Sequence, residues 1–223
     1  MFTPLNPIQR FISRLFDFTS IGRLLMANYL LQKNFLSKIG WNKSVKGKKP
    51  VDKKGGELPW FTYSFMAFLK DRIQVEMQIF EYGSGNSTLW FSKKGCAVVS
   101  VEHHKAWYDS MFAKITANPK VEYLWRDLES KAYSMEILNY QKAFDVIILD
   151  GRDRVNCCLN SLGALKDNGV ILWDNSDREE YNEGYQFLID NGFKRLDFHG
   201  LGPINSKMWC TSVFYKQDNC LGI

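Results

Sequence analysis

From Gln78 onward, short hydrophobic runs alternate with longer segments in which hydrophobic residues recur every three or four positions. The first pattern is typical of buried strands and the second of amphipathic helices. Phe144–Asp150 is the clearest strand, because its hydrophobic run is unbroken from Val146 and ends at an acid. The pattern predicts strands over Gln78–Tyr82, Ala97–Val101, Val121–Leu124, Phe144–Asp150, Gly169–Asp174, Lys194–Phe198 and Trp209–Tyr215.

Helical patterns lie between most of these strands. The predicted helices begin near Ser87 and cover Lys105–Thr116, Lys131–Tyr140, Val155–Lys166 and Glu179–Asn191. Repeated strand–helix units of this length predict an α/β fold with a doubly wound, mostly parallel, Rossmann-like sheet. Ligands of such sheets bind at the carboxyl ends of the strands.

The chain before Gln78 has a different pattern. Residues 1–40 carry a helical hydrophobic stripe, and Trp41–Glu57, rich in Lys and Gly, is predicted to be a linker or flexible loop. Pro59–Leu69 is aromatic and predicts a helix whose Trp60 either lies near the cofactor or packs on the sheet edge. We therefore expect a helical N-terminal extension and linker over residues 1–56 and an enzyme-like domain over residues 57–223.

Charge separates the same two regions. Residues 1–56 contain eleven Lys and Arg but two acids, a net charge of +9, whereas the remaining 18 basic and 22 acidic residues give −4. A basic segment with a hydrophobic stripe either meets an anionic membrane surface or phosphate, or is a solvated, soluble linker. The stripe itself predicts packing on the domain, a peripheral membrane contact through the N-terminal helices, or a homodimer contact.

The cysteines and the hydropathy bear on the compartment. The five cysteines are odd in number and form no C-x-x-C pair, which argues against a disulfide framework or a structural zinc site. No apolar run reaches the ~18 residues of a membrane span. Arg10, Arg14 and Asp17 interrupt any signal-peptide core. We expect a cytoplasmic protein.

A glycine-containing turn follows the first predicted strand, in the sequence Glu81-Tyr-Gly-Ser-Gly-Asn-Ser-Thr88. Its two glycines permit a tight turn and close approach to a ligand, and the amides at the following helix start attract an anion. Glu102 ends the next strand, where an acid accepts hydrogen bonds from a ribose diol. Together these features predict a cofactor that contains adenosine.

Two residues favour S-adenosylmethionine over NAD. Thr88 stands where a dinucleotide fingerprint requires its third glycine. Glu81 would repel a pyrophosphate but not a cationic sulfonium. An NAD-type Rossmann oxidoreductase is the alternative.

Four segments resemble motifs of the class I S-adenosylmethionine-dependent methyltransferases. They are EYGSGNST, VVSVEHH, FDVIILDG and GVILWDN, and the last is similar to the fifth strand of the catechol and caffeoyl-CoA type of O-methyltransferase. The resemblance covers Gln78–Tyr215 and implies the strand order 3-2-1-4-5-7-6 with the last strand antiparallel. It also implies cofactor contacts from Glu81, Gly83, Ser84, Gly85, Ser87, Thr88, Glu102, His103, Asp127 and Asp150. Asp127 is otherwise a surface acid near a helix start.

A second cluster, formed by Asp150, Asp174 and Asn175, ends two adjacent strands. Two carboxylates and an amide oxygen suit Mg²⁺, which would bind the acceptor oxygen and lower its pKa. Catechol-type methyltransferases are similar at these three positions. The alternative is that Asp150 only lines the cofactor pocket and that Asp174 and Asn175 begin a turn.

The catalytic base is a separate question. The catechol-type enzymes have a lysine at the position of Asp153, so Asp153, His103 or another group takes the proton, or the substrate differs. Arg152 and Arg154 are poor bases. They either clamp an anionic acceptor or pair with neighbouring acids such as Asp153 and Asp177.

The sequence therefore predicts an S-adenosylmethionine-dependent methyltransferase that acts on an oxygen of a small or medium acceptor. Asp150, Asp153 and His103 are its candidate catalytic residues, and Mg²⁺ a candidate second cofactor. Besides the oxidoreductase, a non-catalytic methyltransferase-like binding module fits the missing lysine. Nucleic acid is disfavoured, because the core is acidic and no N-P-P-Y-like motif is present.

Overall fold

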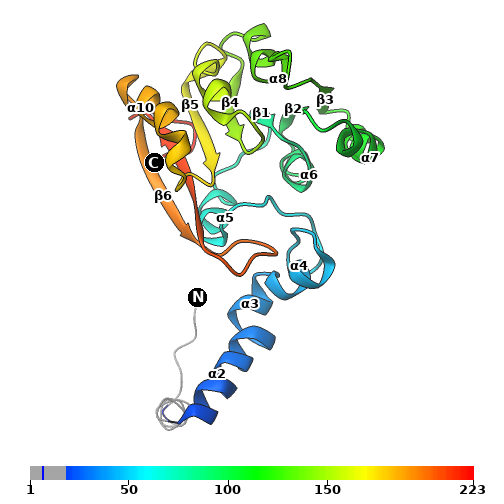
Figure 1. The fold of residues 1–223 in the computed structure, drawn as a ribbon, viewed down its shortest axis with the longest axis vertical. Helices are drawn as coiled ribbons and strands as arrows, with labels where there is room; N and C mark the ends of the chain where they lie inside the picture. The colour runs from blue at the N-terminus through cyan, green and yellow to red at the C-terminus, as the bar shows by residue number, and fades with distance from the viewer. Residues whose placement is uncertain (1–6, 8–18) are drawn as a thin grey trace.

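The computed structural model describes Pro7 and residues 19–223, so the first half of the predicted N-terminal helical stripe lies outside the described residues. Seven strands form one sheet in the order β3-β2-β1-β4-β5-β7-β6 (Figure 1). The strands are β1 (Gln78–Tyr82), β2 (Ala97–Glu102), β3 (Val121–Trp125), β4 (Phe144–Leu149), β5 (Leu165–Asp174), β6 (Lys194–Gly200) and β7 (Trp209–Tyr215).

The predicted topology is confirmed. β1 to β5 pair in parallel, while β7 runs antiparallel to both β5 and β6. Because the chain crosses over from β3 to β4 beside β1, the loops after β1 and β4 diverge at one edge of the sheet. That switch point is where doubly wound sheets bind their ligands.

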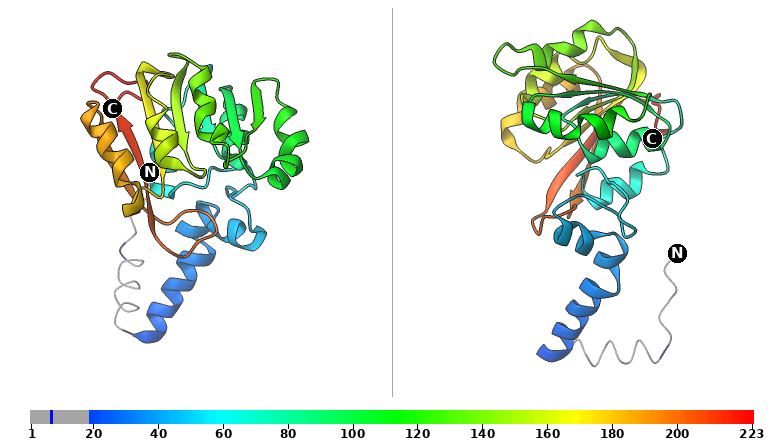
Figure 2. Two further views of the ribbon diagram at one scale, coloured as in Figure 1. Left: turned by 45° about the horizontal axis from the view of Figure 1, so that its top comes forward. Right: turned by 90° about the vertical axis from the view of Figure 1, so that its right-hand side faces the viewer.

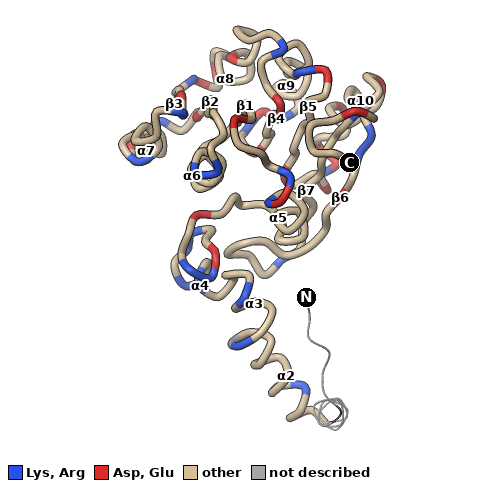
Figure 3. Tube along the Cα trace, turned by 180° about the vertical axis from the view of Figure 1, so that it is seen from behind, with Lys and Arg blue, Asp and Glu red and all other residues tan. Residues whose placement is uncertain are grey.

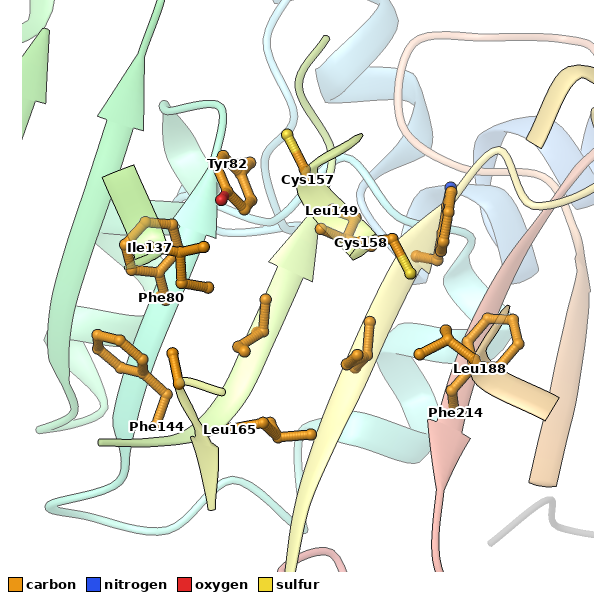
Figure 4. Packing of buried hydrophobic residues seen from close by; sticks show 14 of the residues in the cluster. Phe80, Tyr82, Ile137, Phe144, Leu149, Cys157, Cys158, Leu165, Leu188 and Phe214 are labelled. Carbon is orange, nitrogen blue, oxygen red and sulfur yellow. The ribbon is translucent and has the colours of Figure 1, made fainter. Parts of the chain in front are cut away.

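Helices cover both faces of the sheet (Figure 2). Those after β1 are α6 (Asn86–Lys93), α7 (Lys105–Thr116), α8 (Ala132–Met135), the 3-10 turn η1 (Glu136–Asn139), α9 (Arg154–Leu159), the 3-10 turn η2 (Glu179–Tyr181) and α10 (Asn182–Asp190). Side chains alternate along each strand, so the two largest hydrophobic clusters lie on opposite faces of the sheet. One packs Phe80, Leu149 and Phe214 against α9 and α10 (Figure 4). The other packs Ile79 and Leu172 against the opposite helices.

Two predicted helices are shorter than their patterns indicate. The helix expected over Val155–Lys166 ends at Leu159, because Leu165 already pairs with Phe144 as the start of β5. The helix expected over Lys131–Tyr140 changes to 3-10 geometry after Met135. There the Ser134 carbonyl accepts hydrogen bonds from the Tyr82 hydroxyl at 2.9 Å and from the side-chain amide of Asn160 at 3.0 Å. Tertiary contacts therefore replace helical ones.

Before the sheet, the chain forms α2 (Ser20–Gln32), α3 (Phe35–Lys38), α4 (Trp41–Gly47) and α5 (Tyr63–Leu69). The prediction of a flexible linker over Trp41–Glu57 is wrong. The Ser44 hydroxyl donates to the Val51 carbonyl at 2.9 Å and accepts from its amide at 3.0 Å, which folds the segment back after α4. Its many lysines resemble a solvated loop, but its backbone groups are paired.

Residues 50–57 also hold this segment to the core. The Asn86 side chain donates to the Pro50 carbonyl at 2.7 Å. Glu57 forms ion pairs with Lys93 at 2.5 Å and Lys114 at 3.0 Å, on two different helices. Bonding to Lys93 lowers the pKa of Glu57 to about 2. The segment that leads to α5 is therefore part of the folded domain.

Packing of α10 on the sheet requires a residue without a side chain at Gly184. A Cβ atom on Gly184 would lie 2.5 Å from the ring of the fully buried Trp173, whereas one on Gly163 would meet no atom within 4 Å. We expect Gly184→Ala to lower the free energy of unfolding by ~1–3 kcal/mol through overpacking. Gly163→Ala, the matched control, should change it by less than ~0.5 kcal/mol. Urea unfolding measures both, and equal effects would contradict this account of the α10 contact.

Candidate active site

The carboxyl ends of β1, β2, β4 and β5 open into one cavity of about 970 Å³. Side chains or backbone from all four strand ends line it. Of the predicted site residues, the cavity brings together Gly83, Ser84, Gly85, Ser87, Glu102, His103, Asp150, Asp174 and Asn175.

The glycine turn after β1 is shaped by its neighbour after β4. Gly83 has a φ of +95°, and a Cβ atom there would lie 3.2 Å from the Gly151 amide nitrogen. The two loops therefore approach so closely that only glycine fits at this point. The turn then opens directly into α6, and Gly85, Asn86 and Ser87 at this junction line the cavity.

Glu81 lies behind this turn rather than in the cavity. It is buried, and one of its carboxylate oxygens accepts from the Thr88 hydroxyl at 2.5 Å and the Ser100 hydroxyl at 3.0 Å. Burial raises the pKa of Glu81 to about 7. Thr88 also accepts from the Gly85 amide at 3.0 Å. Neither Glu81 nor Thr88 lines the cavity, so the geometry assigns both to shaping the turn.

Glu102 lies at the cavity wall with its carboxylate held in place. One oxygen accepts from the backbone amides of His103 at 2.9 Å and His104 at 2.8 Å, and the other accepts from the Ser84 hydroxyl at 2.8 Å. The oxygen that bonds Ser84 has a second lone pair, so it retains acceptor capacity for a ligand hydroxyl. A carboxylate fixed in this way at the end of β2 suits a ribose diol.

Asp150 and Asp174 form an acidic pair at the ends of β4 and β5, bridged by Arg154. The Arg154 guanidinium donates to the Asp150 carboxylate at 3.1 Å, to the Asp174 carbonyl, and to the Asn175 side-chain oxygen at 3.4 Å. Two further bonds, both 2.9 Å, reach the carbonyls of Asp150 and Gly151. Burial and the neighbouring Asp174 raise the pKa of Asp150 well above its usual range.

The Asp174 carboxylate is held by two further side chains. One of its carboxylate oxygens accepts from the Thr211 hydroxyl at 2.6 Å and the Trp209 indole at 2.9 Å. Burial still raises its pKa to about 6. The buried guanidinium thus contacts a carboxylate oxygen of Asp150, the side-chain oxygen of Asn175 and the main-chain carbonyl of Asp174. A divalent cation bound to these side chains would lie beside this fixed positive charge, which disfavours it.

The remaining predicted site residues differ in position. Asp127 caps a turn, accepting from the Ser130 amide at 2.7 Å, and does not line the cavity. Asp153 is exposed, lies outside the cavity and accepts from Asn156 at 2.7 Å, which removes the geometric basis for a catalytic base there. His103 lines the cavity, and its Nδ1 atom lies 3.1 Å from a carboxylate oxygen of Glu102. Burial lowers the pKa of the His103 imidazole.

Comparisons with known proteins agree with this architecture. No protein-family model matches the sequence, and no curated protein does. Among solved structures, a methyltransferase from Geobacter sulfurreducens matches at 15% identity with a TM-score of 0.50, covering 88% of this chain and 94% of its own. Precorrin-6y C5,15-methyltransferase from Geobacter metallireducens matches at 13% identity and 0.50, covering 68% and 87%.

The strand order and these structures decide the fold. The chain has the class I methyltransferase fold. Spermidine synthase from Thermotoga maritima matches equally well, with 13% identity, a TM-score of 0.50, and 72% and 61% coverage of the two chains. Because its name denotes another reaction, the likeness establishes the fold alone.

Within this methyltransferase fold, several cavity residues carry no signal in the sequence that would mark them as part of the site. Trp107 on α7 lines the cavity, and its indole donates to the Ser84 carbonyl at 3.0 Å. Lys48 and Lys49, from the segment predicted as linker, form part of the wall with Arg178. The short distance of Trp107 from Glu102 along the chain is the one clue to its position. The lysines come from a segment without periodicity, so their position depends on the fold of residues 41–57.

The Arg154 contacts predict metal-independent behaviour. In the wild-type protein, neither Mn²⁺ nor a chelator should move the thermal unfolding midpoint, and calorimetry should detect no Mn²⁺ binding at ~1 mM. Arg154→Ala leaves the acids uncompensated and should cost ~3 kcal/mol of stability, which added Mn²⁺ should partly restore. Arg152→Ala, at the exposed neighbour, is the control. Mn²⁺ binding to the wild type that Asp150→Asn abolishes would contradict the assignment.

Proposed function

We propose that the protein transfers a methyl group from S-adenosylmethionine to an oxygen of a small or medium acceptor that carries an anionic group. One observation carries the proposal: the glycine turn after β1 and the fixed carboxylate of Glu102 after β2 line the same cavity. A turn that receives an amino-acid moiety and an acid that receives a ribose are together suited to this cofactor.

The cofactor supplies an electrophilic methyl group, and the chain's residues position it and the acceptor. Glu102 would accept hydrogen bonds from the ribose, and the indole of Trp107 lies beside the glycine turn as a flat contact for the base. Asp150 lines the cavity with an elevated pKa, which makes its carboxylate a stronger proton acceptor for an acceptor hydroxyl. Alignment of this kind contributes several kcal/mol to methyl transfer.

The anionic acceptor is supported by the charges at the cavity wall. Lys114 is paired with Glu57 and Arg154 with Asp150, so neither is available to clamp a ligand. Arg152 forms no ion pair with any described residue, and Lys48 and Lys49 likewise form none. Arg178 contributes a further guanidinium that is about half exposed, although it lies 3.6 Å from the exposed carboxylate of Glu180. These cations line the same cavity as Asp150, and they favour an acceptor with a phosphate or carboxylate.

The two alternatives meet different obstacles. For NAD, Thr88 is bonded to Glu81 in the space where a dinucleotide site needs a glycine, and the acid lies directly behind the turn. A non-catalytic binding module shares the cofactor cavity and differs only in turnover. A measurement of methylated product distinguishes this alternative from the enzyme, whereas the geometry of the cavity does not.

Cofactor choice is tested by thermal unfolding with S-adenosylmethionine, S-adenosylhomocysteine and NAD in parallel. An S-adenosyl ligand at ~100 times its dissociation constant should stabilise the protein by ~2.7 kcal/mol, and NAD should not. Glu102→Gln should weaken S-adenosylhomocysteine binding about tenfold or more, since it removes a charged acceptor. Glu122→Gln, an exposed acid on β3, is the matched control. Stabilisation by NAD alone would support the oxidoreductase.

Acceptor charge is tested with pairs of hydroxylated compounds that differ only in a carboxylate or phosphate and its neutral ester. The charged member should be methylated with the higher kcat/KM. The double variant Arg152→Ala/Arg178→Ala should lower that preference at least tenfold and leave S-adenosylhomocysteine affinity within about twofold. Preference for the neutral member would refute the anionic acceptor, and cofactor binding without methylation of any pair would favour the binding module.

A further inference from the structure

The N-terminal helices expose an unusual amount of hydrophobic surface. Ile21 is 72% exposed and Leu24 71% exposed on α2, far more than core side chains of the same type. Figure 1 shows α2 extending away from the sheet, with α3 and α4 between it and the domain. The exposed large hydrophobic residues of this segment are Ile21, Leu24, Leu25, Tyr29, Leu30, Phe35 and Val45. Large hydrophobic side chains exposed together on one segment mark an interaction surface.

The charge of the same segment is of one sign. Ser20–Gly47 contains five basic residues and no Asp or Glu. The basic side chains are Arg23, Lys33, Lys38, Lys43 and Lys46, and Figure 3 shows them distributed along α2, α3 and α4. A second copy of the chain would bring two such positive segments together, which opposes a dimer through this surface. An anionic surface is the complementary partner.

The length of the helices limits how a lipid bilayer would be met. No helix within the described residues is long and apolar enough to cross a membrane. α2 has 13 residues, compared with the ~20 that a spanning helix needs. Its hydrophobic side chains and the neighbouring lysines instead suit the interface between headgroups and acyl chains.

We propose that Ser20–Gly47 docks on an anionic lipid membrane, with the exposed hydrophobic side chains of α2 and α3 in the interface and the basic side chains against the headgroups. The segment continues directly into Lys48 and Lys49, which line the cavity, and Trp41 of α4 donates to the Asn205 carbonyl of the β6–β7 loop at 2.9 Å. Docking would therefore hold the domain that contains the cavity near the membrane. This inference is independent of the cofactor and goes beyond the proposed reaction.

Vesicle sedimentation of the full chain tests the proposal. Vesicles of phosphatidylcholine with ~30% phosphatidylserine should bind the wild-type protein at least tenfold more tightly than phosphatidylcholine alone, and ~0.5 M salt should remove the difference. Ile21→Ser/Leu24→Ser and Lys33→Glu/Lys38→Glu should each weaken binding at least tenfold. Val75→Ser/Leu138→Ser and Lys194→Glu/Lys207→Glu, at exposed positions of the domain, should remain within about twofold.

The unfolding midpoint of each variant shows whether it is folded, and sedimentation equilibrium without vesicles gives its oligomeric state. Absence of binding by the wild type, or equal binding by all variants, would overturn the proposal. A wild-type dimer that Ile21→Ser/Leu24→Ser dissociates, without vesicle binding, would overturn it in favour of a second copy as partner. None of these readouts uses S-adenosylmethionine, so a failure here leaves the proposed reaction untouched.

Discussion

Arg154 lies between the carboxyl ends of β4 and β5, and the geometry of the cavity depends on its contacts. Without a cation, Asp150 and Asp174 would repel each other in a largely buried site, and both pKa values are raised even with the guanidinium present. Arg154 bonds the backbone of both strand ends as well as the Asp150 side chain. It is a weak source of net stability, because burying the charges offsets much of the attraction, but it fixes where the Asp150 carboxylate points.

The opposite wall of the cavity is fixed by different means. There, Glu102 is held by amides and a hydroxyl, while Glu81 is buried behind the glycine turn with one carboxylate oxygen lacking any partner among the described residues. Both acids lie near the carboxyl end of a strand, Glu81 in β1 and Glu102 in β2, but their roles differ. Glu102 offers acceptor capacity to a ligand, whereas Glu81 supports the turn and has a pKa of about 7. The glycine turn and Glu102 thus share one cavity with Asp150, at the ends of β1, β2 and β4.

The sequence is most informative where hydrophobic periodicity and chain topology coincide. Buried strands such as Phe144–Leu149 carry hydrophobic runs, and the strand order implied by the resemblance places their ends together. Pattern and resemblance together therefore identify Glu102, Asp150 and Asp174 as residues of one site. It is least informative where tertiary hydrogen bonds decide the local structure. The Ser134 carbonyl is taken by distant side chains, and nothing local to Arg154 shows that its guanidinium folds back onto the strand ends instead of meeting a ligand.

The segment before the sheet shows why composition alone misleads. Lysines and glycines after Trp41 are typical of a linker, yet Ser44, Asn86 and Glu57 hold this stretch against the domain. A rigid connection has a consequence that a flexible linker would not have. The side chain of Asn42 on α4 donates to the Leu31 carbonyl of α2, so contacts link α2 through α4 to the lysines of the cavity wall. If α2 meets a lipid surface, the cavity faces a fixed direction relative to that surface, and an anionic acceptor presented there would reach the basic wall first.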